Sequence, residues 1–390
     1  MKICLLVSSL GNGGAERVAT TLCNAWAERG DDVMLMPTFS GGGHPFHKVS
    51  SAVELVYLAD RVGITKKHPW SYAKRIVALR NAIKEQSPDV VVSFLPNVNV
   101  AAVLSCSFLR IPLIICERRD PSSQPCPGYW EYACRLTYRH ADMVTLQTDD
   151  AAARAQQIYP GLRKVRSIPN PLPDALFANP KRSGNKRKIL LSLGRLSAEK
   201  QISKSIRAFR DVASRFDDWD LHIYGDGPER SACASLIDEL NLSGRVVLKG
   251  QTADAWAVMA GADAFIMTSR CEGFPNALLE ACGIGLPCVV FDCPSGPKEI
   301  TRGGEDALLV PLDDHGALVA ALSRIMDDAA FRISLGRHAR ESTFNRFRLG
   351  AVMNSWDRLF SEVGAKNGVS SGSVPGNGFC GLASTTTGQS

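Results

Sequence analysis

The sequence predicts an α/β protein with two doubly wound parallel sheets, in two Rossmann-like domains that face each other across a cleft. Short apolar runs alternate with helical stretches of about a dozen residues, which is typical of parallel strands covered by helices on both faces. This rhythm breaks once, at a proline-rich segment over 168–173. The expected strands are 3–7, 32–36, 90–94, 113–116 and 143–146, then 189–193, 221–224, 246–248, 264–267, 288–291 and 307–310.

The two domains are expected to meet at the proline-rich segment. Its three prolines cannot continue a helix or a central strand, and a basic, polar stretch follows over 181–188. We therefore expect a first domain over 1–172, a linker over 173–188 and a second domain over 189–345. A C-terminal helix over 346–362 can return to the first domain. Residues 363–390 are rich in Gly, Ser and Thr and are expected to be disordered.

The composition is that of an ordinary globular protein, with 390 residues, 45% hydrophobic, 22% charged and a net charge of +6. This charge is too small to indicate a nucleic-acid partner. Twelve cysteines are scattered without a C-x-x-C pair, which favours reduced thiols in a cytoplasmic protein. The first apolar run is too short for a signal peptide. The one stretch of membrane length, 98–116, contains Arg110 and Pro112 and is expected to be a helix followed by a strand.

Three loops that follow predicted strands have residues suited to phosphate groups. The backbone of Gly13 and Gly14 can approach an anion at a helix N-terminus, although the same glycines also fit a plain tight turn. Arg195 and Lys200 can reach over the crevice at the end of strand 189–193, or remain solvated charges. Gly225 follows strand 221–224 in another close turn and is expected to contact the same ligand.

Two glutamates accompany the helix that follows strand 264–267. Glu272 precedes it and Glu280 lies on it, while Pro275 suits its first position. Carboxylates accept hydrogen bonds from hydroxyls, whereas cations and helix N-terminal amides neutralise phosphates. Together these groups indicate a nucleotide-sugar site, although each glutamate alone is also typical of a helix-cap charge.

These motifs together resemble a known family. The segments are G-N-G-G-A-E-R, G-R-L-S-A-E-K, Y-G-D-G-P, C-E-G-F-P-N-A-L-L-E-A and F-D-C-P-S-G-P-K-E-I. Over about residues 1–360 the chain is similar to the retaining glycosyltransferases of family 4 (glycosyl transferases group 1), which have the GT-B architecture, and to their bacterial polysaccharide and lipid-linked glycan members. The resemblance implies that the first domain binds the acceptor and the second binds the nucleotide sugar.

The resemblance also implies roles for individual residues. Glu280 would hold the ribose hydroxyls, and Glu272 would act as a catalytic residue that holds the donor sugar. Arg195 and Lys200 would bind the diphosphate. The resemblance also implies that the donor is contacted by Gly13, Gly14, Gly273, Phe274 and Pro275.

One residue departs from the family pattern. Many members have a catalytic-site histidine shortly after the strand that corresponds to 113–116, whereas this chain has Cys116-Glu117-Arg118 there. We expect Arg118 to occupy that place. A guanidinium is not a base near pH 7, so Arg118 would position substrate or stabilise charge.

Two further segments have residue patterns that can bind ligands. Asp218-Trp219-Asp220 has the D-x-D pattern of metal sites, but it lies at the amino end of a strand. We expect a surface loop there and no obligatory metal or cofactor besides the UDP-sugar donor. Residues 61–84 contain seven cations, no acid and two aromatic residues. They predict either a solvated helix face over a core stripe with Val77 and Ile83, or a surface for anionic membranes or lipid diphosphates.

The expected function is therefore transfer of a hexose or N-acetylhexosamine from a UDP-sugar to a glycan, such as a polyprenyl-diphosphate-linked acceptor, with retention of configuration. A nucleotide-sugar epimerase and an inactive sugar-nucleotide-binding subunit are the alternatives. A nicotinamide dehydrogenase is disfavoured because the first loop lacks G-x-G-x-x-G. We expect a cytoplasmic protein, peripheral on the inner face of the plasma membrane if the basic segment binds lipid.

Overall fold

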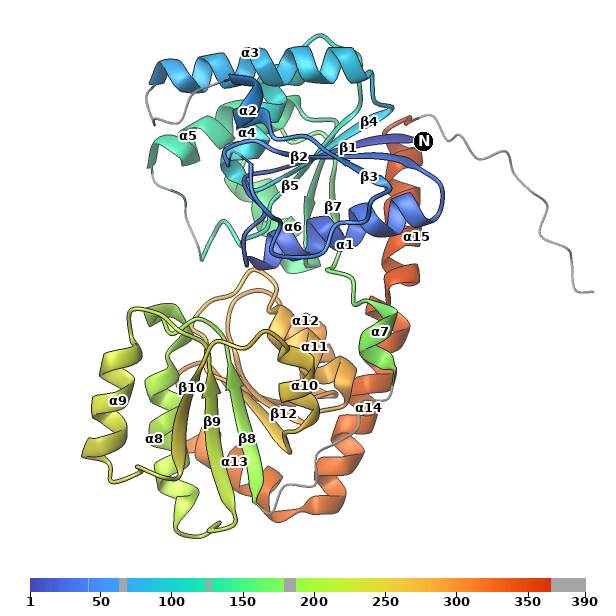
Figure 1. Cartoon of the computed structure of the whole chain (residues 1–390). Helices are drawn as coiled ribbons and strands as arrows, with labels where there is room; N and C mark the ends of the chain where they lie inside the picture. The colour runs from blue at the N-terminus through green and yellow to red at the C-terminus, as the bar shows by residue number, and fades with distance from the viewer. Residues whose placement is uncertain (41, 63–68, 124–125, 127, 179–186, 366–390) are drawn as a thin grey trace, which may run out of the picture.

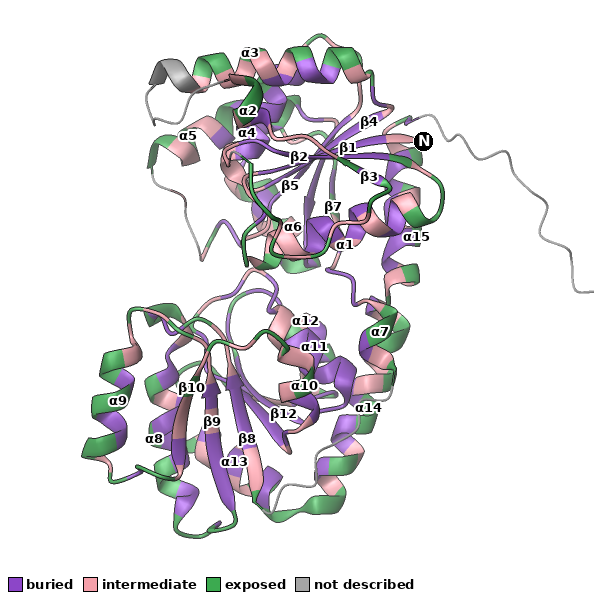
Figure 2. Cartoon of the chain, viewed as in Figure 1, coloured by how far each residue is buried: buried purple, intermediate pink, exposed green. Residues whose placement is uncertain are grey.

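The computed structural model describes residues 1–40, 42–62, 69–123, 126, 128–178 and 187–365. Each half of the chain forms one parallel sheet with helices on both of its faces (Figure 1). The predicted fold class is confirmed. The strands are mostly buried, while exposed residues lie on the outer sides of the helices (Figure 2).

The first domain contains a seven-stranded sheet in the order β3-β2-β1-β4-β5-β6-β7. Its central strands are apolar along their whole length because helices cover both faces, and residues 3–7 are at most 1% exposed. The strands are β1 Lys2–Val7, β2 Asp32–Pro37, β3 Val53–Leu55, β4 Val90–Phe94, β5 Leu113–Cys116, β6 Met143–Leu146 and β7 Val165–Ser167. The helices are α1 Gly14–Glu28, α2 Leu58–Val62, α3 Pro69–Gln86, α4 Pro96–Cys106, α5 Gly128–Thr137, the short η1 Tyr138–His140 and α6 Asp149–Ile158.

The second domain contains a six-stranded sheet in the order β10-β9-β8-β11-β12-β13. The strands are β8 Lys188–Leu193, β9 Trp219–Tyr224, β10 Val246–Gly250, β11 Ala264–Met267, β12 Cys288–Asp292 and β13 Leu308–Pro311. The helices up to β13 are α7 Asp174–Phe177, η2 Ala198–Lys200, α8 Ile202–Ala213, α9 Arg230–Glu239, α10 Ala255–Ala260, α11 Asn276–Ile284, α12 Pro297–Ile300 and η3 Arg302–Gly304. After β13 follow α13 His315–Asp327, α14 Ala329–Phe347 and α15 Leu349–Glu362.

Two strands were not predicted from the sequence. β3 and β7 lie at the two edges of the first sheet, and each has only three residues. Their central residues, Glu54 and Arg166, are exposed and charged, so neither strand forms an apolar run.

The segment that joins the domains differs from the expected linker. Its first part folds as α7, and Leu176 is buried in the core of the second domain. The backbone N–H of Leu172 donates to the carbonyl of Phe347 at 2.7 Å, so the two crossings between the domains lie side by side. The rest of the expected linker, 179–186, and the tail from 366 lie outside the described residues.

The last helix, α15, lies against the first domain. The ring of Trp356 on α15 meets that of Trp26 on α1 with centroids 5.5 Å apart, and Phe360 packs on Trp26 at 5.6 Å. The eleven cysteines within the described ranges are free thiols. Among the described helices, none combines the length and apolar character needed to cross a bilayer.

Candidate active site

A cleft between the domains contains two adjoining pockets at the carboxyl ends of the sheets. We call the cavity of about 420 Å³ around Glu272 the Glu272 pocket, and the cavity of about 470 Å³ around Glu280 the Glu280 pocket. Six residues line both: Gly14, Leu193, Gly194, Arg195, Asn276 and Ala277. The two pockets therefore adjoin, and Arg195 is one of the residues that lie where they meet.

All eleven site residues predicted from the sequence line this cleft. Those of the Glu272 pocket are Arg118, Lys200, Glu272, Gly273, Phe274 and Pro275. Those of the Glu280 pocket are Gly13, Gly225 and Glu280, and Gly14 and Arg195 line both. Their roles stay predictions, but the structure brings them together from five loops.

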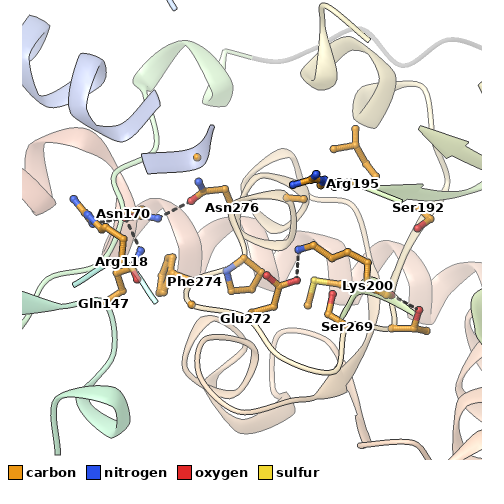
Figure 3. Close-up of a pocket in the computed structure, with 18 of the residues that line it drawn as sticks. Arg118, Gln147, Asn170, Ser192, Arg195, Lys200, Ser269, Glu272, Phe274 and Asn276 are labelled. Atoms are coloured by element: carbon orange, nitrogen blue, oxygen red, sulfur yellow. Dashed lines mark hydrogen bonds and ion pairs between the residues drawn. The ribbon is translucent and has the colours of Figure 1, made fainter. Parts of the chain in front are cut away.

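Glu272 is paired within its own domain. Its Oε1 lies 2.6 Å from the Nζ of Lys200, and the residue is 7% exposed (Figure 3). The loop of Lys200 is fixed to the end of β11, because the hydroxyl of Thr268 donates to the carbonyl of Gln201 at 3.0 Å. A carboxylate has four lone-pair positions, so Glu272 keeps acceptor sites for a ligand's hydroxyls.

Glu280 is paired across the cleft. Its Oε1 lies 2.8 Å from an Nη atom of Arg17, which lies on α1 of the first domain. Glu280 is 4% exposed. Burial raises the pKa of this carboxyl, and the neighbouring Arg17 guanidinium opposes that rise.

Two glycines permit close backbone approaches. A Cβ on Gly273 would lie 2.5 Å from the carbonyl oxygen of Arg118, so the loop before α11 touches the first domain here. Gly225 has φ +134°, and its Cβ would lie 1.8 Å from the carbonyl oxygen of Gly194. Glycine is therefore required at both positions for the cleft to keep this shape.

Arg118 lies on the first-domain side of the Glu272 pocket. Its guanidinium stands 3.7 Å from the ring centroid of Phe94 and donates to Oδ1 of Asn170 at 2.8 Å. Burial lowers the pKa of Arg118 to about 10, so it stays charged near neutral pH. Its Nε and its second Nη have no hydrogen-bond partner among the described residues.

An amide network, which sequence analysis missed, connects the domains beside Arg118. Asn170 accepts from Nε2 of Gln147 at 3.3 Å and donates to Oδ1 of Asn276 at 2.7 Å (Figure 3). Asn170 lies between Pro169 and Pro171 at the domain boundary, where the sequence pattern indicates a connection and not a site residue. Arg17 was also missed, although it lies one helical turn after Gly14 and therefore on the same face.

Asp218 lies in an exposed turn, as expected, but Asp220 does not belong to a surface loop. β9 begins at Trp219, whose side chain is fully buried, so Asp220 belongs to the strand. Asp220 pairs with Arg187 at 2.6 Å and with Arg245 at 3.0 Å. In the part of the chain that the structure describes, no three His, Cys, Asp or Glu side chains gather as metal ligands.

The basic segment also differs from the expectation. Ile83 is buried, but Val77 is 58% exposed and does not belong to the core stripe. Arg75 and Arg80 turn inward and donate to the carbonyls of Thr38 and Ser105. Residues 63–68, with Lys66 and Lys67, lie outside the described residues.

The position of Pro275 also differs from the prediction. Pro275 is the N-cap of α11, one position before the first helical residue.

Two family models match the chain. The model for Glycosyltransferase Family 4 matches residues 12–175, and the model for Glycosyl transferases group 1 matches residues 176–342. The two matches adjoin at α7, where the second domain begins.

Individual proteins are similar along most of the chain. An exopolysaccharide phosphotransferase of Streptomyces coelicolor is 29% identical over 379 residues, covering 90% of this chain but only 39% of that longer protein. A Campylobacter jejuni GalNAc-α-(1→4)-GalNAc-α-(1→3)-diNAcBac-PP-undecaprenol α-1,4-N-acetyl-D-galactosaminyltransferase is 26% identical over 365 residues, covering 93% of this chain and 99% of that protein.

A solved structure has the same fold. Anabaena HepE in complex with UDP matches with a TM-score of 0.76 and 18% identity, over 93% of this chain and 100% of that one.

Proposed function

Because this chain belongs to glycosyltransferase family 4, with a group 1 transferase domain as its second half, we propose that it moves a hexose or N-acetylhexosamine from a UDP-sugar to a lipid-linked glycan or polysaccharide precursor. The Campylobacter relative, whose name gives a lipid-linked glycan as its acceptor, supports this acceptor class. Retention of the donor's configuration is proposed from the family.

The observation that carries this proposal is the arrangement of the two pockets. A buried carboxylate lies in each pocket, and Arg195 and the first residues of α11 lie where the pockets meet. A UDP-sugar has the same order of groups: hydroxyls at the ribose, a diphosphate in the middle and hydroxyls at the sugar. We place the ribose at Glu280, the diphosphate at Arg195 and the sugar at Glu272.

Charge at the diphosphate drives the proposed chemistry. When the bond between the anomeric carbon and the diphosphate oxygen breaks, negative charge grows on the departing UDP. Arg195, Lys200 and the N-terminal amides of α11 offer fixed positive charge there. These groups can do the work of a metal ion, so we propose that activity needs none.

The acceptor would enter from the first domain, beside Arg118. Arg118 is charged at neutral pH, lines the Glu272 pocket and has two buried guanidinium nitrogens without a hydrogen-bond partner among the described residues. It can therefore orient the acceptor or the departing phosphate, and it cannot remove the acceptor's proton.

We also propose that the first domain binds anionic lipid surfaces through α3. Its Lys74, Val77 and Lys84 are exposed, whereas Arg75 and Arg80 are engaged with the protein and drop out of this surface. A Lys74→Gln/Lys84→Gln variant should sediment less with anionic liposomes than the parent. This difference between variant and parent should become smaller as the salt concentration rises. Unchanged sedimentation would leave α3 as a solvated face.

The proposed function is tested by a binding screen followed by a transfer assay. UDP-sugars should raise the melting temperature more than GDP- or ADP-sugars, and the best donor should glycosylate a polyprenyl-diphosphate-linked acceptor with an α linkage by NMR. A new sugar isomer formed from UDP-sugar alone would indicate an epimerase. A β-linked product would contradict retention.

A further inference from the structure

Arg17 of the first domain lines the nucleotide end of the cleft. It lies one turn after Gly14, whose backbone borders both pockets. One Nη atom is 2.8 Å from Oε1 of Glu280, and the guanidinium carbon lies 5.3 Å from the ring centroid of Trp256. Two groups of the second domain therefore fix this side chain of the first.

This contact changes what Glu280 can offer to a ligand. A carboxylate that is almost fully buried needs a cationic partner or hydrogen-bond donors to stay ionised. Arg17 engages Oε1, and Trp256 lies beside the same carboxylate, whose pKa it also lowers; Glu280 itself lines the Glu280 pocket. Without Arg17, the carboxyl would keep its burial and lose the ion pair.

We propose that Arg17 is a positioning residue for the donor's ribose, because it holds Glu280 ionised and orients its free oxygen to accept a ribose hydroxyl. This inference rests on the proposed function, in which a UDP-sugar places its ribose at Glu280. It makes recognition of the ribose depend on both domains, since the carboxylate belongs to one and its cation to the other.

The other charged groups near Glu280 do not replace Arg17. His47, Arg195 and Asp226 border the Glu280 pocket from three other loops. Burial, followed by the nearby Arg17, lowers the pKa of His47 and favours its neutral form. On the opposite side of α11, Arg340 of α14 donates to the carbonyl of Ile284. Arg17 is the guanidinium that pairs with Glu280 among the described residues.

The test compares the affinities of UDP and 2′-deoxy-UDP by calorimetry from pH 5.5 to 8.5. The parent should prefer UDP by about 10-fold or more, the value expected for a hydrogen bond to a charged acceptor. Removing the cation raises the pKa of Glu280 further, and the ionised form is lost as pH falls through that pKa. Arg17→Gln should therefore reduce the preference to about threefold or less at pH 6 and regain part of it at pH 8.5.

Two variants separate positioning from simple contact between domains. Arg17→Lys restores the positive charge and should keep most of the preference at pH 6. Glu299→Ala removes another contact across the cleft, in which the backbone N–H of Asp149 donates to Oε2 of Glu299 at 3.0 Å outside both pockets. At pH 8 the Glu299→Ala variant should lose affinity for UDP and for 2′-deoxy-UDP by the same factor. The melting temperature of each variant checks that it is folded.

The outcomes distinguish this inference from the function on which it rests. If Arg17→Gln weakens UDP and 2′-deoxy-UDP by the same factor at every pH, Arg17 only holds the domains together and the inference is overturned. A double variant, Arg17→Gln with His47→Gln, tests whether His47 is the group that titrates. If the preference of this double variant for UDP over 2′-deoxy-UDP no longer depends on pH, His47 titrates in place of Glu280 and the inference is also wrong. If the parent itself binds both nucleotides equally, the ribose role proposed for Glu280 fails first.

Discussion

The two buried carboxylates of the cleft have cationic partners of different origin. Glu272 pairs with Lys200, which belongs to the same domain, whereas Glu280 pairs with Arg17 of the opposite domain. The ion pair at the sugar end is thus formed within the second domain alone, although Arg118 of the first domain lines the same pocket. The nucleotide end is complete only when the first domain lies against it, so nucleotide binding and domain closure should depend on each other there.

The largest effect is expected from Glu272→Gln. This change removes the charge that pairs with Lys200 at the reacting end of the donor, so turnover should fall about 100- to 1,000-fold, as for the loss of one preorganised group in a desolvated site. UDP affinity should not fall, because UDP lacks the sugar and Lys200, released from Glu272, keeps its charge for the diphosphate. Glu305→Gln, an exposed glutamate of the same domain that lines neither pocket, is the matched control.

A smaller effect is expected from Glu280→Ala. Loss of a buried acceptor should weaken UDP about 10- to 100-fold by calorimetry. The same variant leaves Arg17 without its partner, so the interface between the domains should also become less protected from hydrogen exchange. Unchanged UDP affinity would show that the nucleoside lies elsewhere.

A third carboxylate, Glu299, sharpens the comparison because, within the described residues, it forms no ion pair with the other domain. Burial, together with the charges of Asp149 and Asp150, raises the pKa of Glu299 to about 7, although the Asp149 N–H bond opposes the rise. The folded chain then binds a proton that the unfolded chain releases between about pH 4.5 and pH 7, so this group's contribution to stability falls as pH rises through that window.

Glu299→Gln removes this titration. From pH 5 to pH 8 the variant should gain about 1 to 3 °C in melting temperature relative to the parent. Parallel melting curves across this range would mean that Glu299 titrates normally. The effect should be smaller than that of either pocket glutamate on function, because Glu299 lines neither pocket.

The smallest effect is expected from metal removal. Arg195 and Lys200 already supply positive charge between the two carboxylates, so EDTA should leave turnover unchanged. Loss of activity with EDTA and recovery with magnesium or manganese would contradict this, and a metal site would then have to be sought.

More of the site residues could be predicted from the sequence in the second domain than in the first. Arg195, Lys200 and Glu272 each follow the end of a buried strand, and parallel strands bring such loops to one edge of a sheet. The fold was predicted for the same reason, except for β3 and β7, which are too short and too polar to form apolar runs.

Contacts across the cleft could not be predicted in this way. Arg17 and Asn170 act on residues more than 100 positions away, and local periodicity says nothing about which side chains meet between two domains. Val77 is a residue that the sequence wrongly placed in the core. It is apolar and has the spacing of a buried helix face, yet it is exposed.

The most direct test of this account is calorimetry of UDP and of the preferred UDP-sugar on the parent, Glu272→Gln and Glu280→Gln proteins. The account predicts that Glu280→Gln weakens both ligands by the same factor, because both contain the ribose. Glu272→Gln should not lower UDP affinity and should remove the extra affinity that the sugar adds. A Glu272→Gln protein that loses UDP affinity as strongly as Glu280→Gln would contradict the assignment of one carboxylate to each end of the donor.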